Sequence, residues 1–167
     1  MERNQNDCHP GIVLYLNDPS HFSFLRDEDQ RDFNIISEKI GKIATKLTRI
    51  PHSQIRIRDL IIVKCEIKSK VFLQRARVHK VKAMGFYAHI LDLGFYRDAD
   101  EAFEMPQELR IHPPVAVECR LNKIMPINEE DWTREDCDYM MKMIVGSERC
   151  ILQEEGVDGV VVNFRLL

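Results

Sequence analysis

The order of sequence patterns along this 167-residue chain limits its fold more than any single motif does. Residues 55–96 are rich in β-branched and aromatic residues, arranged in short runs with polar breaks, which is typical of a small antiparallel sheet. A strand-and-helix pattern lies on each side of this segment. We therefore expect the two outer parts to belong together, with a compact β unit inserted between them.

The N-terminal flank predicts two strands followed by a helix. Residues 11–25 form two apolar runs separated by the turn-forming sequence Asn-Asp-Pro-Ser at 17–20. Apolar residues then recur every three or four positions, which places them on one face of a helix over about residues 33–50: Ile36, Ile40, Ile43, Leu47 and Ile50. Pro51 ends this helix, because proline disfavours the helical state of the residue before it.

The C-terminal flank predicts a strand, a helix and two final strands. The first strand lies within residues 115–124, after an acidic segment and a short helical turn. Thr133 and Asp136 have the spacing of a capping box, and the apolar residues behind them have helical spacing. Residues 149–153 and 160–167 form the two final strands.

Composition excludes several classes of function. The net charge of -3 and pI near 6.1 argue against a protein that mainly wraps nucleic acid. The five cysteines are widely spaced and include no C-x-x-C pair, so we expect reduced thiols in the cytoplasm and no metal site. The sequence contains no run approaching the ~20 apolar residues of a membrane span. It also contains no catalytic or cofactor-binding motif, so the chain is not expected to be an enzyme.

Several short motifs occur in an order that matches a known family. The segment DPSHFSF at 18–24 resembles the family's entry motif, and LQRARV at 73–78 matches its W-Y-R-A-x-V motif at R-A-x-V only. DLGF at 92–95 takes the place of D-Y-G-N, HPPVAVECRL at 112–121 resembles L-P-x-x-A-x-x-C-x-L, and Trp132 is similar to a downstream tryptophan. From about Gly11 to Leu166, the chain thus resembles an extended Tudor domain.

This resemblance implies a β-rich α+β fold. A Tudor barrel at 57–113 is inserted in a split, staphylococcal-nuclease-like (OB-type) subdomain formed by 11–56 and 114–167, with a long linking helix. The resemblance also implies that Arg75 and Asp92 form a salt bridge that stabilises the barrel. The alternative is that both are solvated charges on strands.

The residues at the implied ligand site depart from the family's pattern. Members of the family bind symmetrically dimethylated arginine in a cage of aromatic rings beside an asparagine, because the methylated cation is attracted to ring faces. The matching cage positions here are Gln74, Ile90 and Leu93, and Phe95 replaces the asparagine. A further cage position falls within residues 63–68, which contain no aromatic residue. We therefore expect no preference for methylated arginine.

The ligand that the resemblance implies is the arginine-rich N-terminal tail of a PIWI-class Argonaute, in the piRNA pathway of perinuclear germ granules. An unmethylated arginine is expected to bind through carboxylates and backbone carbonyls, since its guanidinium keeps all its donors. The alternative is that residues 98–108 form a solvated acidic loop. The residues predicted to bind the peptide are Gln74, Ile90, Asp92, Leu93, Phe95, Tyr96, Asp98, Asp100 and Glu101.

Two other functions remain open at this stage. One is single-stranded RNA binding through the OB-like surface and a basic strand that contains Arg75, Arg77, His79, Lys80 and Lys82. Acidic neighbours and the lack of aromatic residues within that strand favour a solvated face instead. The other is a structural or dimerisation domain.

Overall fold

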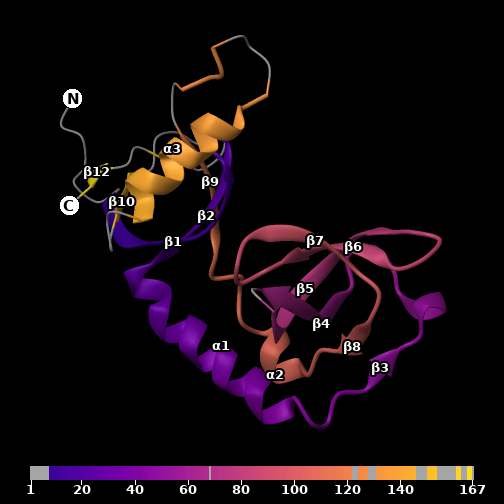
Figure 1. Ribbon diagram of the computed structural model, residues 1–167. Coiled ribbons are helices and arrows are strands. Elements are labelled where there is room, and N and C mark those ends of the chain that lie inside the picture. The colour runs from indigo at the N-terminus through magenta and orange to yellow at the C-terminus, as the bar shows by residue number, and fades with distance from the viewer. Residues whose placement is uncertain are drawn as a thin grey trace. The chain divides into compact units, whose positions relative to one another are not determined.

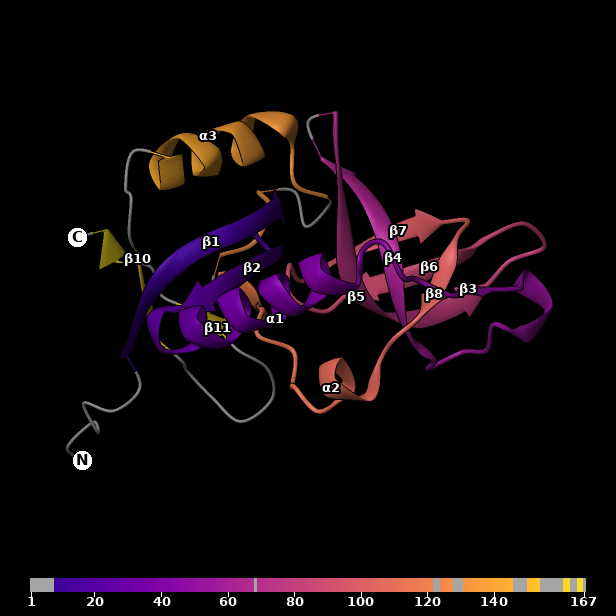
Figure 2. The ribbon, with the colours of Figure 1, turned by 90° about the horizontal axis from the view of Figure 1, so that it is seen from below.

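The computed structural model describes residues 8–67, 69–121, 124–127, 131–145, 150–153, 161–162 and 165–166. Its contacts divide the chain into two compact units, shown in Figures 1 and 2. The flanking unit is formed by Met1–Gln30 with Ala116–Leu167, and the barrel unit is Arg31–Val115. The contact boundaries at 30/31 and 115/116 differ from the expected 56/57 and 113/114, because the predicted linking helix groups with the barrel.

The barrel unit is a single curled antiparallel sheet with two helices (Figure 1). The strands lie in the order β3-β8-β4-β5-β6-β7. The helices are α1 (Gln30–Ile43) and α2 (Gln107–Arg110). The strands are β3 (Arg49–Ile50), β4 (Leu60–Ile67), β5 (Lys70–Val81), β6 (Phe86–Ile90), β7 (Phe95–Ala99) and β8 (Ala102–Glu104).

Side-chain alternation gives this sheet a buried inner face. In β6 the burial pattern alternates, with Phe86, Ala88 and Ile90 buried and the two residues between them half-buried. This alternation is the period of two expected for a strand with one face on a core. The buried core cluster of the barrel consists of Ile55, Ile61, Val63, Cys65, Ala76, Val78, Phe86, Ala88, Ile90 and Ala102.

The linking helix is shorter than predicted. The helix α1 ends at Ile43 instead of about residue 50, and turn hydrogen bonds follow, including one of 2.8 Å from the Lys46 amide to the Ile43 carbonyl. Arg49 and Ile50 form β3 and pair with β8. Ile50 packs against the barrel core from this strand. Its apolar side chain therefore belongs to the sheet, although its spacing also fitted the helical pattern.

The β-rich sequence at 86–96 contains a tight turn. A hydrogen bond of 2.8 Å from the Gly94 amide to the Ile90 carbonyl closes this turn, and Gly94 has a φ of 73°. Glycine adopts that conformation without the steric cost of a Cβ. The strands β6 and β7 therefore lie side by side, with Ile90 opposite Phe95.

The flanking unit is a second sheet, in the order β11-β9-β2-β1-β10-β12, with one helix against it (Figure 2). Met140 of that helix, α3 (Arg134–Val145), packs with Phe22, Phe24 and Cys119 of the sheet. The strands of the flanking unit are β1 (Cys8–Asp18), β2 (His21–Arg26), β9 (Val117–Leu121), β10 (Cys150–Gln153), β11 (Val161–Val162) and β12 (Arg165–Leu166).

Local signals at the start of α3 are confirmed. The hydroxyl of Thr133 donates to the Asp136 carboxylate (2.7 Å), and the Asp136 amide donates back to that hydroxyl (3.2 Å). The indole of Trp132 donates to the Ser20 hydroxyl (2.7 Å) in the turn between β1 and β2.

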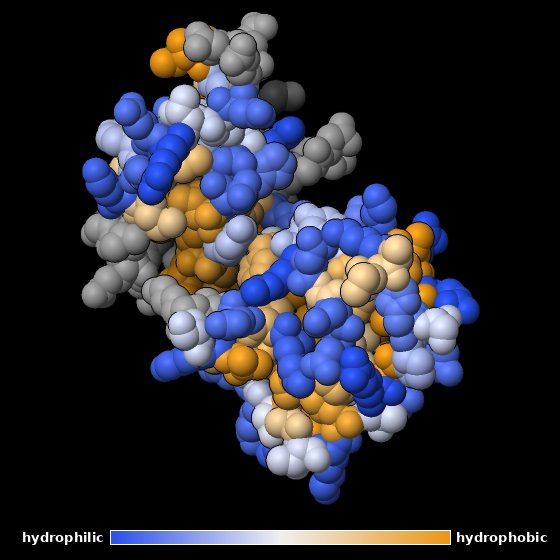
Figure 3. Space-filling view, turned by 45° about the vertical axis from the view of Figure 1, so that its right-hand side comes forward, coloured by the Kyte–Doolittle hydropathy of each residue, from blue (hydrophilic) through white to orange (hydrophobic). Residues whose placement is uncertain are grey.

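Hydrophilic side chains cover much of the visible surface of both units, broken by smaller apolar patches (Figure 3). In the described ranges, no helix has both the length and the hydropathy to cross a membrane.

Candidate peptide-binding site on the barrel

A buried ion pair supports the barrel next to the candidate site. Arg75 of β5 and Asp92 of the β6–β7 turn form the predicted salt bridge, with Nε donating to Oδ2 (2.8 Å) and Nη2 to Oδ1 (2.6 Å). Their side chains are only 1% and 3% exposed. This bidentate geometry is the strong form of an arginine–carboxylate interaction.

The remaining donors of Arg75 stabilise the segment that follows α2. Nη1 donates to the carbonyls of Leu109 (2.7 Å) and His112 (2.6 Å), and Nη2 donates to that of Pro113 (2.9 Å). All five N–H groups of the guanidinium are therefore satisfied. Because Asp92 is buried and engaged by Arg75, it positions neighbouring residues and has no surface to offer a ligand.

The four residues at the cage positions and the asparagine position lie on the inner side of the barrel. Ile90 is 1% exposed and belongs to the core cluster, so it presents no surface to a ligand. Leu93 and Phe95 are partly buried and pack against the same cluster. Gln74 is half-buried on β5, opposite the buried Val63. Ile90, Leu93 and Phe95 thus pack with the barrel core, and Gln74 is the one polar residue of the four.

Two residues near this position were missed by sequence reasoning. Phe72 is 42% exposed and lies on the same face of β5 as Gln74, two residues away. Arg97 lies on the inner face of β7, opposite Ala88, and its Nη1 donates to the Glu66 carbonyl of β4 (2.7 Å). The alternation of side chains along β7 could have placed Arg97 on the same face as Phe95. That inference required knowing that β7 begins at Phe95.

The side chain of Arg97 brings a positive charge to this end of the barrel. Burial raises the pKa of the Cys65 thiol, and the charge of Arg97 acts on it in the opposite direction. Cys65 is fully buried on β4, next to Glu66. This end of the barrel therefore carries a cation of its own, which electrostatically disfavours a second cation nearby.

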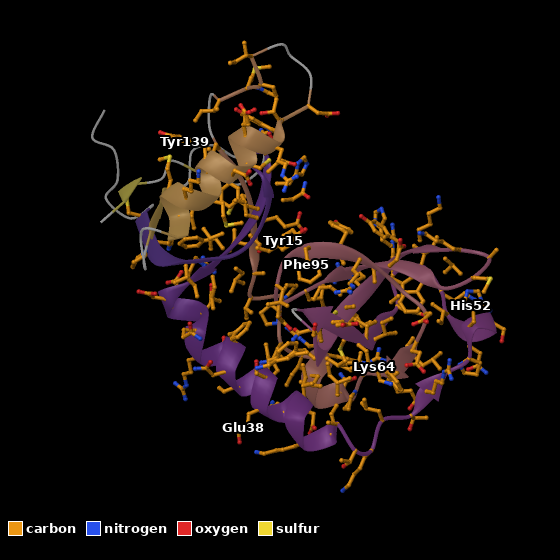
Figure 4. The ribbon with its side chains drawn as sticks, viewed as in Figure 1. Tyr15, Glu38, His52, Lys64, Phe95 and Tyr139 are labelled. Carbon is orange, nitrogen blue, oxygen red and sulfur yellow. The ribbon has the colours of Figure 1, made fainter. Side chains whose placement is uncertain are left out.

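The predicted acidic contacts lie elsewhere on the barrel. Tyr96 and Asp98 project from the opposite face of β7 to Phe95, because side chains alternate along a strand. Asp98 pairs with Lys82, and it lines a depression of about 800 Å³ together with Asp100 and His52. Figure 4 shows His52 and Phe95 at opposite ends of the barrel unit.

Glu101 is the third predicted acceptor and already has basic partners. The Lys64 ammonium donates to its carboxylate (2.9 Å), and Arg49 lies 3.6 Å away. The hydrogen bond and charge of Lys64, with a smaller contribution from Arg49, lower the pKa of Glu101 below its usual range. Apart from the buried Asp92, the predicted residues form two groups: Gln74, Ile90, Leu93 and Phe95 inside the barrel, and Tyr96, Asp98, Asp100 and Glu101 outside it.

Comparison with known proteins agrees with this architecture. The family described as Tudor domain matches residues 4–123, which is more than half of the chain. A curated relative, Protein tudor of Drosophila melanogaster, is 27% identical over 143 residues, covering 78% of this chain. The chain spans only 5% of the length of that relative.

Two solved structures show the same fold. An extended Tudor domain of mouse TDRD1, in complex with a MILI peptide containing dimethylarginine, has a TM-score of 0.78 at 16% identity and covers 99% of this chain and 84% of that one. A complex of Tudor and Aubergine with symmetrically dimethylated arginine has a TM-score of 0.74 at 16% identity, with coverages of 96% and 92%. The predicted fold class is confirmed, and the chain belongs to the Tudor domain family, with the fold of an extended Tudor domain.

Proposed function

We propose that this domain is a protein-interaction module that binds an arginine-containing segment of a PIWI-class Argonaute, independently of arginine methylation, in the piRNA pathway. Two of the similar solved structures are complexes with MILI and Aubergine, which supports an Argonaute segment as the ligand. The proposed organisation is a barrel core at 57–113 within a split subdomain. The proposed location is the perinuclear germ granule, and the role is that of a scaffold without catalysis.

The residues at the cage positions support methylation independence. A ring stabilises a bound cation by about 0.5–2 kcal/mol, and the matching positions here hold Gln74, Ile90 and Leu93. Ile90 is 1% exposed, so no rearrangement of a surface side chain opens that position. The guanidinium of Arg97 adds a like charge on the inner face of β7. A dimethylated arginine gains nothing here from its methyl groups.

The outer carboxylates offer an unmodified arginine a different contact. Asp98 and Asp100 both line the depression at the end of the barrel that contains the β5–β6 turn. Within the described residues, Asp100 has no ion-pair or hydrogen-bond partner, whereas Asp98 has Lys82. An unmodified guanidinium has five donors in a planar fork, which suits two neighbouring carboxylates. Tyr96, 43% exposed, provides an aromatic surface nearby on β7.

Charge reversal tests this contact. We expect Asp98→Lys, and separately Glu101→Lys, to weaken binding of an unmodified arginine-rich Argonaute tail peptide roughly 10- to 100-fold, as expected for loss of hydrogen bonds to a charged group. The matched control is Glu38→Lys on α1, which makes the same change in net charge at an exposed carboxylate. Gln74→Ala should leave the affinity unchanged. If calorimetry gives equal losses of peptide affinity for Glu38→Lys and Asp98→Lys, the effect is nonspecific electrostatics. That result would refute the assignment of Asp98 as a peptide contact.

A further inference from the structure

The outer face of β5, β6 and β7 presents basic and aromatic side chains together. Sequence reasoning found the basic residues on one strand but no aromatic residue among them. The sheet supplies the rings from the neighbouring strands: Arg77 lies opposite His89, Lys80 opposite Tyr87, and His89 opposite Tyr96. We call these residues the basic aromatic face: Arg77, His79, Lys80, Tyr87, His89 and Tyr96.

The rings of this face form a stack across strands. Tyr96 stacks on His89 with centroids 4.7 Å apart and planes at 26°, and on Tyr87 at 5.6 Å and 22°. His79 meets Tyr96 edge-on at 5.5 Å. These separations are too short for a ring to enter between them, so a planar ligand would stack on the solvent-exposed part of the group. Tyr96, the ring shared by these three contacts, keeps 43% of its surface exposed.

A break in strand pairing places His79 and Lys80 on this surface. The register of β5 with β6 shifts between Val78 and Lys80, which is a β-bulge. A bulge turns two successive side chains toward one face and increases the local twist. His79 contacts both tyrosine rings, and Lys80 lies beside Tyr87, so the bulge adds both a ring and a charge to the same face.

The charge at Arg77 and Lys80 is positive, whereas Asp98 projects from the same face of the sheet, opposite Tyr87. In the described part of the chain, neither Arg77 nor Lys80 forms an ion pair. Lys82 lies at the end of the face, 5.6 Å from the centroid of Tyr87, and is paired with Asp98. Arg77 also lines a cavity of about 210 Å³ with Arg110 and Arg75. From Arg77 to Lys82 the strand is about 17 Å long, at ~3.4 Å per residue.

We propose that the basic aromatic face binds single-stranded nucleic acid, with bases stacking on the exposed part of the rings around Tyr96 and phosphates contacting Arg77 and Lys80. Sequence-independent single-strand binding combines these two elements, aromatic stacking and a positively charged path for the backbone. Like charge disfavours an arginine-rich peptide at Arg77 and Lys80. The two proposed ligands therefore share Tyr96 and differ in the charged groups beside it, which are Asp98 and Asp100 for the peptide and Arg77 and Lys80 for the nucleic acid. An acidic peptide would use the cations but would gain little from the stack, so the rings decide between the two anionic partners.

Fluorescence anisotropy with a labelled uridine oligomer tests this proposal. We expect binding at low salt, with a slope of log K against log[salt] of about -1.4, from two phosphate contacts at ~0.7 each. Tyr96→Ala should weaken binding about 5- to 100-fold, the range for one stacked base, and Tyr96→Phe should restore it. The matched control is Tyr139→Ala on α3, where the tyrosine is 68% exposed. Arg77→Gln should reduce the magnitude of the slope by about 0.7.

Three results would overturn the proposal. One is the absence of binding at low salt by a protein with wild-type circular dichroism. Another is equal affinity for an oligoglutamate peptide of matched charge, which would show that the surface selects charge alone and fits an acidic protein. The last is an equal effect of Tyr96→Ala and Tyr139→Ala. Because Arg77→Gln lies outside the proposed peptide contacts, its effect on the oligomer is independent of the outcome for peptide binding.

Discussion

Removing the carboxylate of Asp92 is expected to destabilise the barrel unit far more than removing an exposed one. In Asp92→Ala, two donors of Arg75 lose their acceptor while the guanidinium stays buried at 1% exposure. Breaking one partner of a buried ion pair costs about 3–5 kcal/mol. The three carbonyl contacts of Arg75, at 2.6–2.9 Å, hold the charge in place and prevent it from reaching water.

Hydrogen exchange measures this loss within the barrel unit alone. We expect protection of the β5 and β6 amides to fall roughly 10²- to 10⁴-fold, since ~1.4 kcal/mol corresponds to a factor of ten. Glu38→Ala on α1 is the control, because Glu38 is 67% exposed in its pair with Lys42. The double variant Arg75→Met/Asp92→Leu should recover only part of the loss, because three carbonyls lose their donor. Equal protection in Asp92→Ala and Glu38→Ala would refute the assignment of the pair as a stabilising element.

Three further predictions concern packing, backbone and thiols. Ile90→Ala should destabilise the barrel by about 2–5 kcal/mol in urea unfolding, as expected for a buried core residue; a loss below about 1 kcal/mol would mean that the cage position is not filled. Gly41→Ala should stabilise the protein by about 0.5–1 kcal/mol, because a Cβ at residue 41 meets nothing within 4 Å. Gly85→Ala should destabilise the protein, because Gly85 has a φ of +72° and a Cβ there would lie 2.5 Å from the Ala99 carbonyl oxygen. Melting temperatures of the two variants that change in the same direction would contradict this prediction. Cys65, fully buried and with its pKa raised by burial, should resist iodoacetamide while the exposed Cys8 reacts, as peptide mass mapping would show.

Much of the fold follows from local signals in the sequence. The turn at Pro19 and Ser20, the cap at Thr133 and the alternation along β6 are each determined by a few neighbouring residues. The end of α1 is not, because Ile50 fits both a helical stripe and a strand in the barrel core. Pairing of β3 with β8, more than fifty residues later in the chain, decides between the two.

The site was less accessible to sequence reasoning because it depends on register. The bulge at His79 and the turn closed by Gly94 decide which residues of β5, β6 and β7 share a face. A shift of one residue would exchange Tyr96 with Phe95 and move every side chain of β7 to the other face. The Arg75–Asp92 pair was predictable because the motif resemblance fixed both partners, whereas the contact of Arg97 required knowledge of strand order.

The most direct test of the account is the affinity ratio between two forms of one peptide. An arginine-rich Argonaute tail is synthesised once unmodified and once with its arginine symmetrically dimethylated, and both are titrated into the domain by calorimetry at the same salt concentration. With Gln74, Ile90 and Leu93 at the cage positions, we predict that the unmodified peptide binds at least as tightly as the methylated one. Tighter binding of the methylated peptide by about tenfold or more, the contribution of one to two cage rings, would contradict the account.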